Sequence, residues 1–175
     1  MTLNIKHTLV RVSLKYGAIG GLLVGALVVF LYFMNKNPLS NARYSDLFIL
    51  LVFVLFSIRE FRDVHNNKVL HFWQGLSVGT ITVLIIAILS SVCIVAICMT
   101  DPDLLPGYVA EKIDFVNQNK ETLIETIDER AYRDTIQGLK ETSVADMALD
   151  DFLKKTIIGL ILSIIISIIF RKKPL

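Results

Sequence analysis

The residues best suited to chemistry form one charged cluster in the string SIREFRDVHNNK, directly after a long apolar run. Two cations and two anions fall within five positions there: Arg59, Glu60, Arg62 and Asp63. Arg59 and Asp63 are four residues apart, a spacing that pairs opposite charges on one face of a helix. Charges beside a membrane segment are typical of a site for a lipid headgroup, an ion or a partner subunit. The alternative is an ordinary anchor whose charged ends reach water.

Other candidate chemistry is scarce in this chain. Its three histidines, at His7, His65 and His71, share no metal-ligand spacing with cysteines or carboxylate pairs. Cys93 and Cys98 are five residues apart in an apolar run, so they lie on different faces of a helix and favour neither a disulfide nor a redox pair. The sequence has no glycine-rich phosphate loop and no nucleophile motif. We therefore predict no catalytic residue, no metal site and no cofactor.

The composition indicates that lipid surrounds most of the chain. Of its 175 residues 54% are hydrophobic, and the mean hydropathy is +0.61. Apolar segments predict four membrane-spanning helices, at about 16–34, 44–63, 73–99 and 152–170, in a single integral membrane domain over 1–175. A cleaved signal peptide competes for the first segment, but that apolar run is longer than a signal core. We expect an all-α protein, a four-helix transmembrane bundle with an extramembrane helical arm between helices three and four.

The second apolar run is too short to span a membrane alone. Leu47 to Ile58 would cover only about 18 Å of a ~30 Å hydrocarbon core. We expect its helix to continue through Arg59 to about Asp63, with residues 66–68 forming the turn that follows. Glu60 should then point toward the bundle or toward the N-terminal segment and have a basic partner there.

Lysines and arginines near the spans predict the orientation. Three segments on one side of the membrane carry three each: Lys6, Arg11 and Lys15; Arg59, Arg62 and Lys68; Arg171, Lys172 and Lys173. The positive-inside rule therefore predicts that both termini are cytoplasmic. The net charge of +2 gives no indication of nucleic acid, because the basic residues lie at membrane edges.

The loop at 100–151 is the only sizeable water-exposed segment, and it is acidic. Apolar residues at Val109, Ile113, Val116, Leu123 and Ile127 recur at helical spacing and predict an amphipathic helix. A glycine at position 138 is expected to break or bend that helix. The arm is either a docking surface or lid over the outer mouth, or a hairpin that packs on its own bundle.

Small residues recur at every fourth position in three of the predicted helices. They are Gly17, Gly21 and Gly25; Gly75 and Gly79; and Gly159, Ser163 and Ser167. In lipid such stripes let two backbones approach closely. We expect helices one and three to meet near Gly21 and Gly79. Contact with a second copy, or a ligand groove, is the alternative for each stripe.

Three strings of the sequence resemble a known family: YGAIGGLLVG, SIREFRDVHNNKVLHFWQGLSVG and KTIIGLILSIIISIIFRKKP. The chain resembles the bacterial membrane family called "domain of unknown function 4199", which is found mainly in Bacteroidota. The most specific part is the Ile-Arg-Glu-aromatic-Arg-Asp string, followed by Asn and an aromatic-x-x-Gly start of helix three. Lys68 stands where the family pattern leads us to expect a glycine. The resemblance implies a four-helix protein of the bacterial inner membrane, and it implies no activity.

These patterns favour a non-catalytic accessory or scaffold subunit of an inner-membrane protein complex. Its expected partners are membrane lipid and another inner-membrane protein, with a homo-oligomer as a further option and no nucleic acid. The alternative is a small transporter or lipid-binding carrier that uses the cluster after helix two. A transporter should show a polar track that leads from this cluster into the bundle, whereas a scaffold should show a dry core of small residues.

Overall fold

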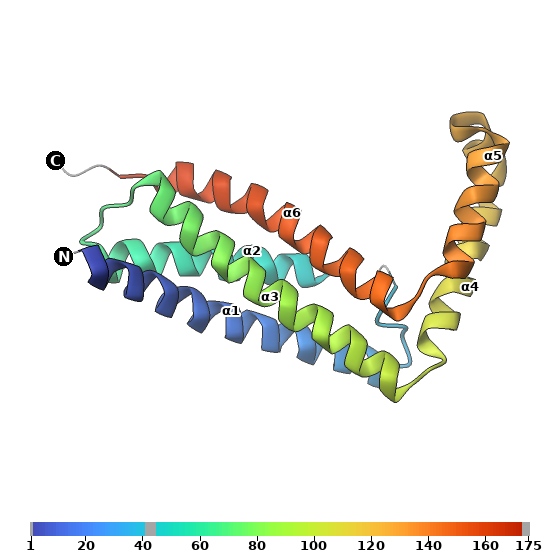
Figure 1. Ribbon diagram of the computed structural model, residues 1–175, viewed down its shortest axis with the longest axis horizontal. Helices are drawn as coiled ribbons and strands as arrows, with labels where there is room; N and C mark the ends of the chain where they lie inside the picture. Colours follow the sequence, from blue (N-terminus) through green and yellow to red (C-terminus); the bar gives the residue numbers. More distant parts are fainter. Residues whose placement is uncertain (1, 41–44, 173–175) are drawn as a thin grey trace.

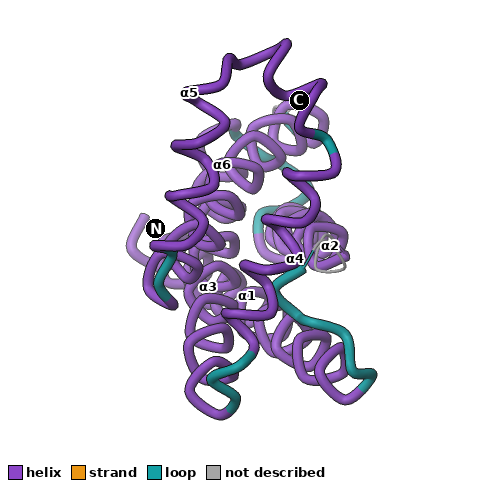
Figure 2. The backbone as a smooth tube through the Cα atoms, turned by 90° about the vertical axis from the view of Figure 1, so that its right-hand side faces the viewer, coloured by secondary structure: helices purple, strands orange, loops and turns teal. Residues whose placement is uncertain are grey.

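The computed structural model describes residues 2–40 and 45–172, except for the side chains of residues 2–6, 122, 123 and 125–127. Within these ranges the chain forms helices and loops with one isolated bridge (Figure 2). In chain order the helices are α1 (Thr2–Phe33), α2 (Ser45–Glu60), the π-helical turn η2 (Phe61–His65), α3 (Phe72–Thr100), α4 (Leu104–Gln118), α5 (Lys120–Glu141) and α6 (Val144–Phe170). The predicted all-α class is confirmed.

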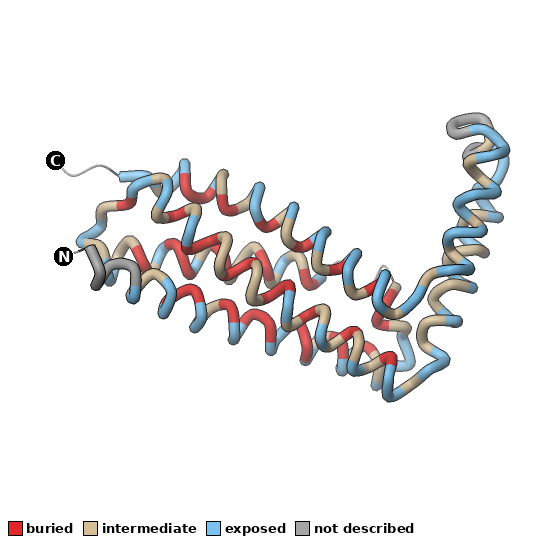
Figure 3. Tube along the Cα trace, viewed as in Figure 1, coloured by how far each residue is buried: buried red, intermediate tan, exposed pale blue. Residues whose placement is uncertain are grey.

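Four of these helices, α1, α2, α3 and α6, run side by side (Figure 1). α3 is packed along both α1 and α6, and α2 contacts all three of the others. Their buried residues face one another along the length of the bundle (Figure 3). Three helices, over His7–Phe33, Phe72–Thr100 and Val144–Phe170, are long and apolar enough to cross a membrane. α2 has 16 residues, about 24 Å of helix, and is the short member.

The helix that contains the second apolar run continues past Arg59, as expected because that run is too short to span a membrane alone. α2 ends at Glu60 and passes directly into η2, which extends to His65. Asn67 and Lys68 then turn the chain with φ values of 50° and 62°. Lys68 thus occupies the left-handed region that glycine adopts at least cost, which explains the glycine expected there. Beyond the turn, Leu70 exchanges two backbone hydrogen bonds with Lys172, so the segment after α6 is tied to this loop.

The segment between α3 and α6 forms a hairpin of α4 and α5 that projects from one end of the bundle (Figure 1). The prediction of a break at Gly138 is wrong, because α5 runs through it. The breaks lie instead at Asn119 and at Asp128, whose φ of 70° interrupts α5. Val109 and Ile113 remain on one helix, whereas the side chains at 123 and 127 lie outside the described set. Further along, the guanidinium of Arg133 donates to Glu129 and holds the pKa of that carboxyl below its ordinary value.

The small residues lie at helix contacts within the chain, but not at the pairing we expected. The glycines of α1 face α3, where a Cβ at Gly21 would meet Leu89. Gly79 faces α6 and α2 instead, 2.5 Å from Ser163 Oγ and 3.1 Å from Ile58 Cδ1 when a Cβ is built on it. α1 thus packs on α3 at Gly21 as expected, but the expectation that Gly79 lies opposite Gly21 is wrong. The reason is the register of α1 relative to α3. Ser13 of α1 lies level with Val78 of α3 and donates to the carbonyl of that residue at 3.1 Å.

The remaining glycines of the three stripes also lie where α1 packs on α3 or where α3 packs on α6. Gly17 and Gly25 face Ile85 and Cys93 of α3, and Gly75 faces Ser167 of α6. Gly159 of α6 faces Val83 of α3. α3 thus packs closely on both neighbours, with glycines of α1 on one side and alternating glycines and serines shared with α6 on the other.

Candidate functional site

The charged cluster after α2 connects three helices at the end of the bundle that carries the two chain termini (Figure 1). Glu60 accepts hydrogen bonds from Lys15 Nζ at 2.8 Å and from the Tyr16 hydroxyl at 2.6 Å, both on α1. His65 Nε2 lies 3.7 Å from the same carboxylate. The expected basic partner of Glu60 is therefore Lys15, in the N-terminal segment, which was one of the two predicted locations.

The other members of the cluster bind mainly to one another. Arg62 donates two hydrogen bonds to Asp63, at 2.6 and 3.0 Å, while Arg59 lies 3.6 Å from that carboxylate. The nearest partner of Asp63 is thus its neighbour in sequence, not the residue four positions earlier. Arg62 also lies over the ring of Phe170, 4.7 Å from its centre, and so reaches α6. The cluster thus connects α1, η2 and α6, and most of its charges are paired with an opposite charge nearby.

Replacement of Glu60 by glutamine should lower stability only slightly. The Lys15 side chain is 53% exposed, so water screens the pair and a loss below about 1 kcal/mol is expected. The Tyr16 hydrogen bond can persist with the amide oxygen. Denaturant unfolding of the purified protein in detergent checks this, with Lys15→Met as the matched change on the other partner. A loss as large as that of a fully buried ion pair would contradict this account.

A second charged cluster, which we call the buried triad, lies deep in the bundle near its other end. Lys155 of α6 is 2% exposed, and Asp46 of α2 and Asp151 of α6 are each 4% exposed. Lys155 Nζ lies 2.6 Å from Asp46 Oδ2 and also bonds Asp151 Oδ1. Ser90 of α3 donates to the other oxygen of Asp151 at 2.7 Å. Four polar side chains thus link α2 to α6 through an ion pair, and α3 to α6 through a charge-assisted hydrogen bond.

The triad lies at the level where the short helix α2 begins. Lys155 is eleven residues after the start of α6 at Val144, on the order of 16 Å along the axis. α2 begins at Ser45, beside Asp46, so the start of α2 lies well inside the ends of its neighbours. Charges at such depth are costly unless paired, because the surroundings are of low dielectric. Lys155 supplies that pairing.

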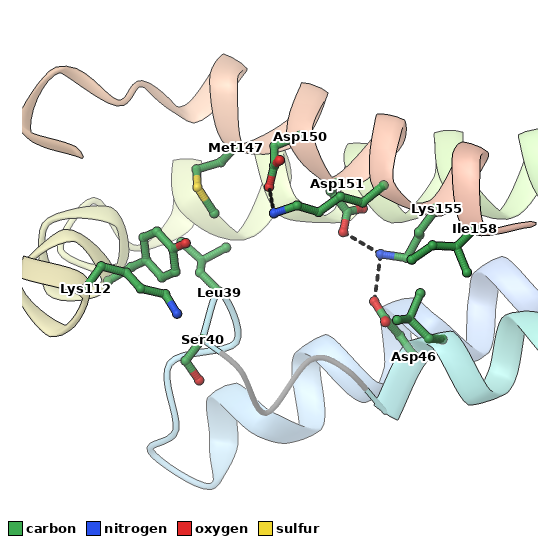
Figure 4. A pocket seen from close by; sticks show the side chains of 12 residues that line it. Leu39, Ser40, Asp46, Lys112, Met147, Asp150, Asp151, Lys155 and Ile158 are labelled. Carbon is green, nitrogen blue, oxygen red and sulfur yellow. Dashed lines mark hydrogen bonds and ion pairs between the residues drawn. The ribbon is translucent and has the colours of Figure 1, made fainter. Parts of the chain in front are cut away.

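A cavity of about 170 Å³ opens beside the triad, between the bundle and the base of the hairpin (Figure 4). Apolar side chains, among them Leu39 and Met147, form part of its wall. The charged lining is mixed: Asp46, Asp150 and Asp151 with Lys112, Lys154 and Lys155. Figure 4 shows Lys112 and the Asp46–Lys155 pair on opposite sides of this space. Among the described residues no group of three or more His, Cys, Asp or Glu is placed to hold a metal ion.

Sequence reasoning missed the triad, although one signal for it was present. The stripe Gly159, Ser163, Ser167 continues backwards at the same spacing to Lys155 and Asp151. Residues four apart share a helix face, so the packing face of α6 carries these two charges into the bundle. Asp46 similarly begins the buried face of α2. Asp46 lies directly before the second apolar run and Lys155 directly before the fourth, so both resembled the ends of membrane spans.

Between the two clusters the described core is largely apolar and tightly packed. Three buried hydroxyls there donate to carbonyls of their own helices: Ser57 to Val54, Thr82 to Val78 and Ser163 to Gly159. The buried hydroxyl oxygens of Thr156 and Ser167 have no hydrogen-bond partner among the described residues. Around them lie fully buried aliphatic side chains, namely Leu50, Ile58, Val83, Ile86 and Ala87. Hydroxyls bonded in this way satisfy their own helix and form no continuous path.

Comparison with known proteins adds a family and nothing more specific. No curated protein and no solved structure matches the chain. A match to a family described as "Protein of unknown function (DUF4199)" covers residues 15–172 and so includes both charged clusters and the hairpin. With nearly its whole length in that match, the chain belongs to the DUF4199 family.

Proposed function

We propose that this protein is a non-catalytic accessory or scaffold subunit of a bacterial inner-membrane complex, with four membrane spans and both termini in the cytoplasm. The observation that carries the proposal is the hairpin of α4 and α5, which stands clear of the bundle (Figure 1). Among the described side chains of the hairpin, those at its base, Leu104, Leu105 and Tyr108, pack on the bundle core. A projecting element of this kind offers a surface to another protein.

The surface of the hairpin favours a partner with a basic, water-exposed face. Residues 101–143 contain ten Asp and Glu against five Lys and Arg. α4 has no buried residue, and Phe115 on it is 58% exposed. Exposed aromatic side chains surrounded by charge are common at protein interfaces. The hairpin thus combines an apolar anchor with an acidic surround.

The core of the bundle favours a scaffold over a transporter. A transporter that uses the cluster after α2 would need a polar route inward from Glu60. Instead, the described layer next to it consists of Ile58, Phe61 and Leu70, each at most 1% exposed. The stripes of glycine and serine hold the helices too close together for a wide pathway.

The fourth span is α2, which reaches far enough only with η2. Together the two run from Ser45 to His65, about 31 Å of helix, which matches a ~30 Å hydrocarbon core. Trp73 is exposed at the terminus-bearing end, where indole rings favour the membrane interface. Lysines and arginines also gather at this end, which supports a cytoplasmic location for it.

Site-specific photocrosslinking in the native membrane tests the scaffold role. A photoreactive phenylalanine analogue at Phe115 should capture one defined membrane protein, identified by mass spectrometry after mild detergent extraction. The same analogue at Phe48, which is exposed on the apolar surface of α2, is the matched control and should capture lipid only. Equal protein capture at both positions, or none at Phe115, would refute the proposal.

Cysteine labelling tests the orientation. A membrane-impermeant maleimide should modify Asn119→Cys at the hairpin in intact cells with a permeable outer membrane. The same reagent should modify Lys172→Cys only after lysis, because positive segments are retained inside. The unsubstituted chain is the background control, since Cys98 is buried and Cys93 is partly buried. The reverse pattern would invert the topology.

A further inference from the structure

The end of the bundle that carries the chain termini has an excess of positive charge. Its described segments, 7–15, 59–71 and 171–172, contain seven Lys and Arg against two carboxylates. Both carboxylates, Glu60 and Asp63, already lie in ion pairs with cations of the same end. Three further cations there are exposed: Lys68, Arg171 and Lys172. The charge at this end therefore favours an anion from outside the chain.

Backbone contacts bring two of these cations to one place. Lys172 follows α6, and its N–H and carbonyl exchange hydrogen bonds with those of Leu70, at 3.1 and 2.9 Å. Lys68 lies two residues before Leu70, and its own N–H donates to the carbonyl of Arg62 at 2.9 Å. The turn before α3 and the segment after α6 are thus joined through backbone atoms. The two ammonium groups take no part in these hydrogen bonds.

The surface next to these cations is apolar. In the last turn of α6, Ile168 and Ile169 are 60% and 68% exposed, and two cations follow almost directly, at positions 171 and 172. At the start of α3, Trp73 is 73% exposed and lies three residues after Leu70. Exposed aliphatic side chains of a membrane span contact acyl chains, and an indole ring favours the membrane interface. An apolar surface thus passes into a cationic one within about one helical turn.

From these features we propose that the turn at 66–71 and the segment after α6 bind one anionic phospholipid. The lipid phosphate lies against the cations at positions 68, 171 and 172, and the acyl chains lie along Ile168 and Ile169. A soluble phosphate would match the cations but would leave the apolar surface uncovered, so the observations favour a lipid. The inference rests on the proposed membrane placement of the bundle and is independent of the partner at Phe115.

The charge of the headgroup decides which lipid is preferred. Phosphatidylcholine also carries a phosphate, but its quaternary ammonium cancels that charge and would be repelled by neighbouring cations. Phosphatidylglycerol keeps its negative charge and is attracted to clustered Lys and Arg. At the opposite end of the bundle Lys36 lies near Asp101 and Asp103, so an anion there would meet like charges. We therefore expect a preference for anionic lipid at the terminus-bearing end.

Fluorescence quenching of Trp73, the one tryptophan of the sequence, tests the proposal. The full-length protein in detergent micelles is given phosphatidylglycerol or phosphatidylcholine with identical acyl chains that are brominated near the headgroup. Phosphatidylglycerol should reach half-maximal quenching at a mole fraction about tenfold lower than phosphatidylcholine. A micelle has no inside or outside and holds no partner, so a failure here would leave the proposed orientation and scaffold role untouched. Equal quenching by both lipids would overturn the inference.

Removal of the three cations locates the site. The triple variant Lys68→Gln, Arg171→Gln and Lys172→Gln should quench equally with both lipids, because the backbone hydrogen bonds at position 172 persist without the ammonium. The matched control removes three exposed lysines elsewhere: Lys36→Gln, Lys140→Gln and Lys154→Gln. That control should keep the full preference. An equal loss in the two triple variants would reduce the effect to net charge and overturn the site.

A single substitution keeps the test valid if the triple variant fails to fold. Lys68 has a φ of 62°, a conformation that glycine adopts at least cost. Lys68→Gly therefore preserves the turn while it removes one cation, and it should lower the preference for phosphatidylglycerol about threefold. An unchanged preference in this variant would exclude Lys68 and overturn the site as drawn. Displacement of the lipid by glycerol phosphate at a similar concentration would overturn its assignment to a lipid.

Discussion

Replacement of Lys155 by methionine is expected to destabilise the protein by about 3–5 kcal/mol, the typical cost of removing one partner from a buried ion pair. The substitution keeps the length of the side chain but leaves Asp46 and Asp151 without their shared cation. Both carboxylates are 4% exposed, so water cannot replace the lost interaction. Denaturant unfolding in detergent, followed by circular dichroism, should show a much earlier midpoint and reduced accumulation in the membrane.

Removal of the stranded charges should restore much of this loss. In the triple variant with Lys155→Met, Asp46→Asn and Asp151→Asn, none of the three charges of the triad remains, and Ser90 can still donate to the amide oxygen at position 151. Replacing a whole buried ion network by neutral groups is often nearly neutral in stability. Lys154→Met, one residue away and exposed, is the matched control and should change little. A single Lys155→Met variant that unfolds like the wild type would show that the triad does not hold α2 in place.

The bundle helices could be predicted from the sequence because each contains an apolar run with charges near its ends. The assumption that charges mark the ends of apolar runs also explains why the buried triad was missed. Hydropathy treats a charge beside an apolar run as close to the end of a span, so the predicted span of 152–170 had Lys155 in its first turn. In the structure its helix begins eleven residues earlier, at Val144, and the lysine is inside the bundle. Only the four-residue spacing with Gly159 carried that information.

Helix partners were harder to predict than helix positions. A stripe such as Gly17, Gly21 and Gly25 shows that something packs closely against α1, but its spacing does not give the register of the neighbour. The register is fixed by contacts far apart in sequence, such as the hydrogen bond from Ser13 to the carbonyl of Val78. α1 therefore meets α3 at Ile85, Leu89 and Cys93 rather than at the glycines of α3.

The turn after α2 was predictable for a local reason. Two consecutive asparagines, Asn66 and Asn67, stand near the end of the charged string. Asparagine tolerates the left-handed backbone better than most residues. Asn67 adopts it with a φ of 50°. The breaks of the hairpin were not predictable in this way, because Asp128 takes a φ of 70° in a sequence rich in helix formers. Gly138, the residue that local rules favoured as the break, is held within α5.

The same substitution, glycine to alanine, should have opposite effects at two positions of this chain. At Gly159 a new Cβ would lie 2.5 Å from Val83 Cγ2 and 3.0 Å from its Cβ. Valine is confined to one rotamer in a helix, so the methyl cannot rotate away and α3 and α6 must separate. The expected loss is about 1–3 kcal/mol, the usual cost of overpacking.

At Gly138 a new Cβ meets nothing within 4 Å, and the residue is exposed within α5. Alanine there removes backbone freedom from the unfolded chain and should stabilise the protein by about 0.5–1 kcal/mol. Unfolding midpoints of Gly159→Ala and Gly138→Ala, measured side by side in one detergent, should therefore shift in opposite directions. Because the chemical change is identical, an equal shift at both positions would mean that helix propensity alone governs them. Close packing of α6 on α3 would then contribute nothing measurable to stability.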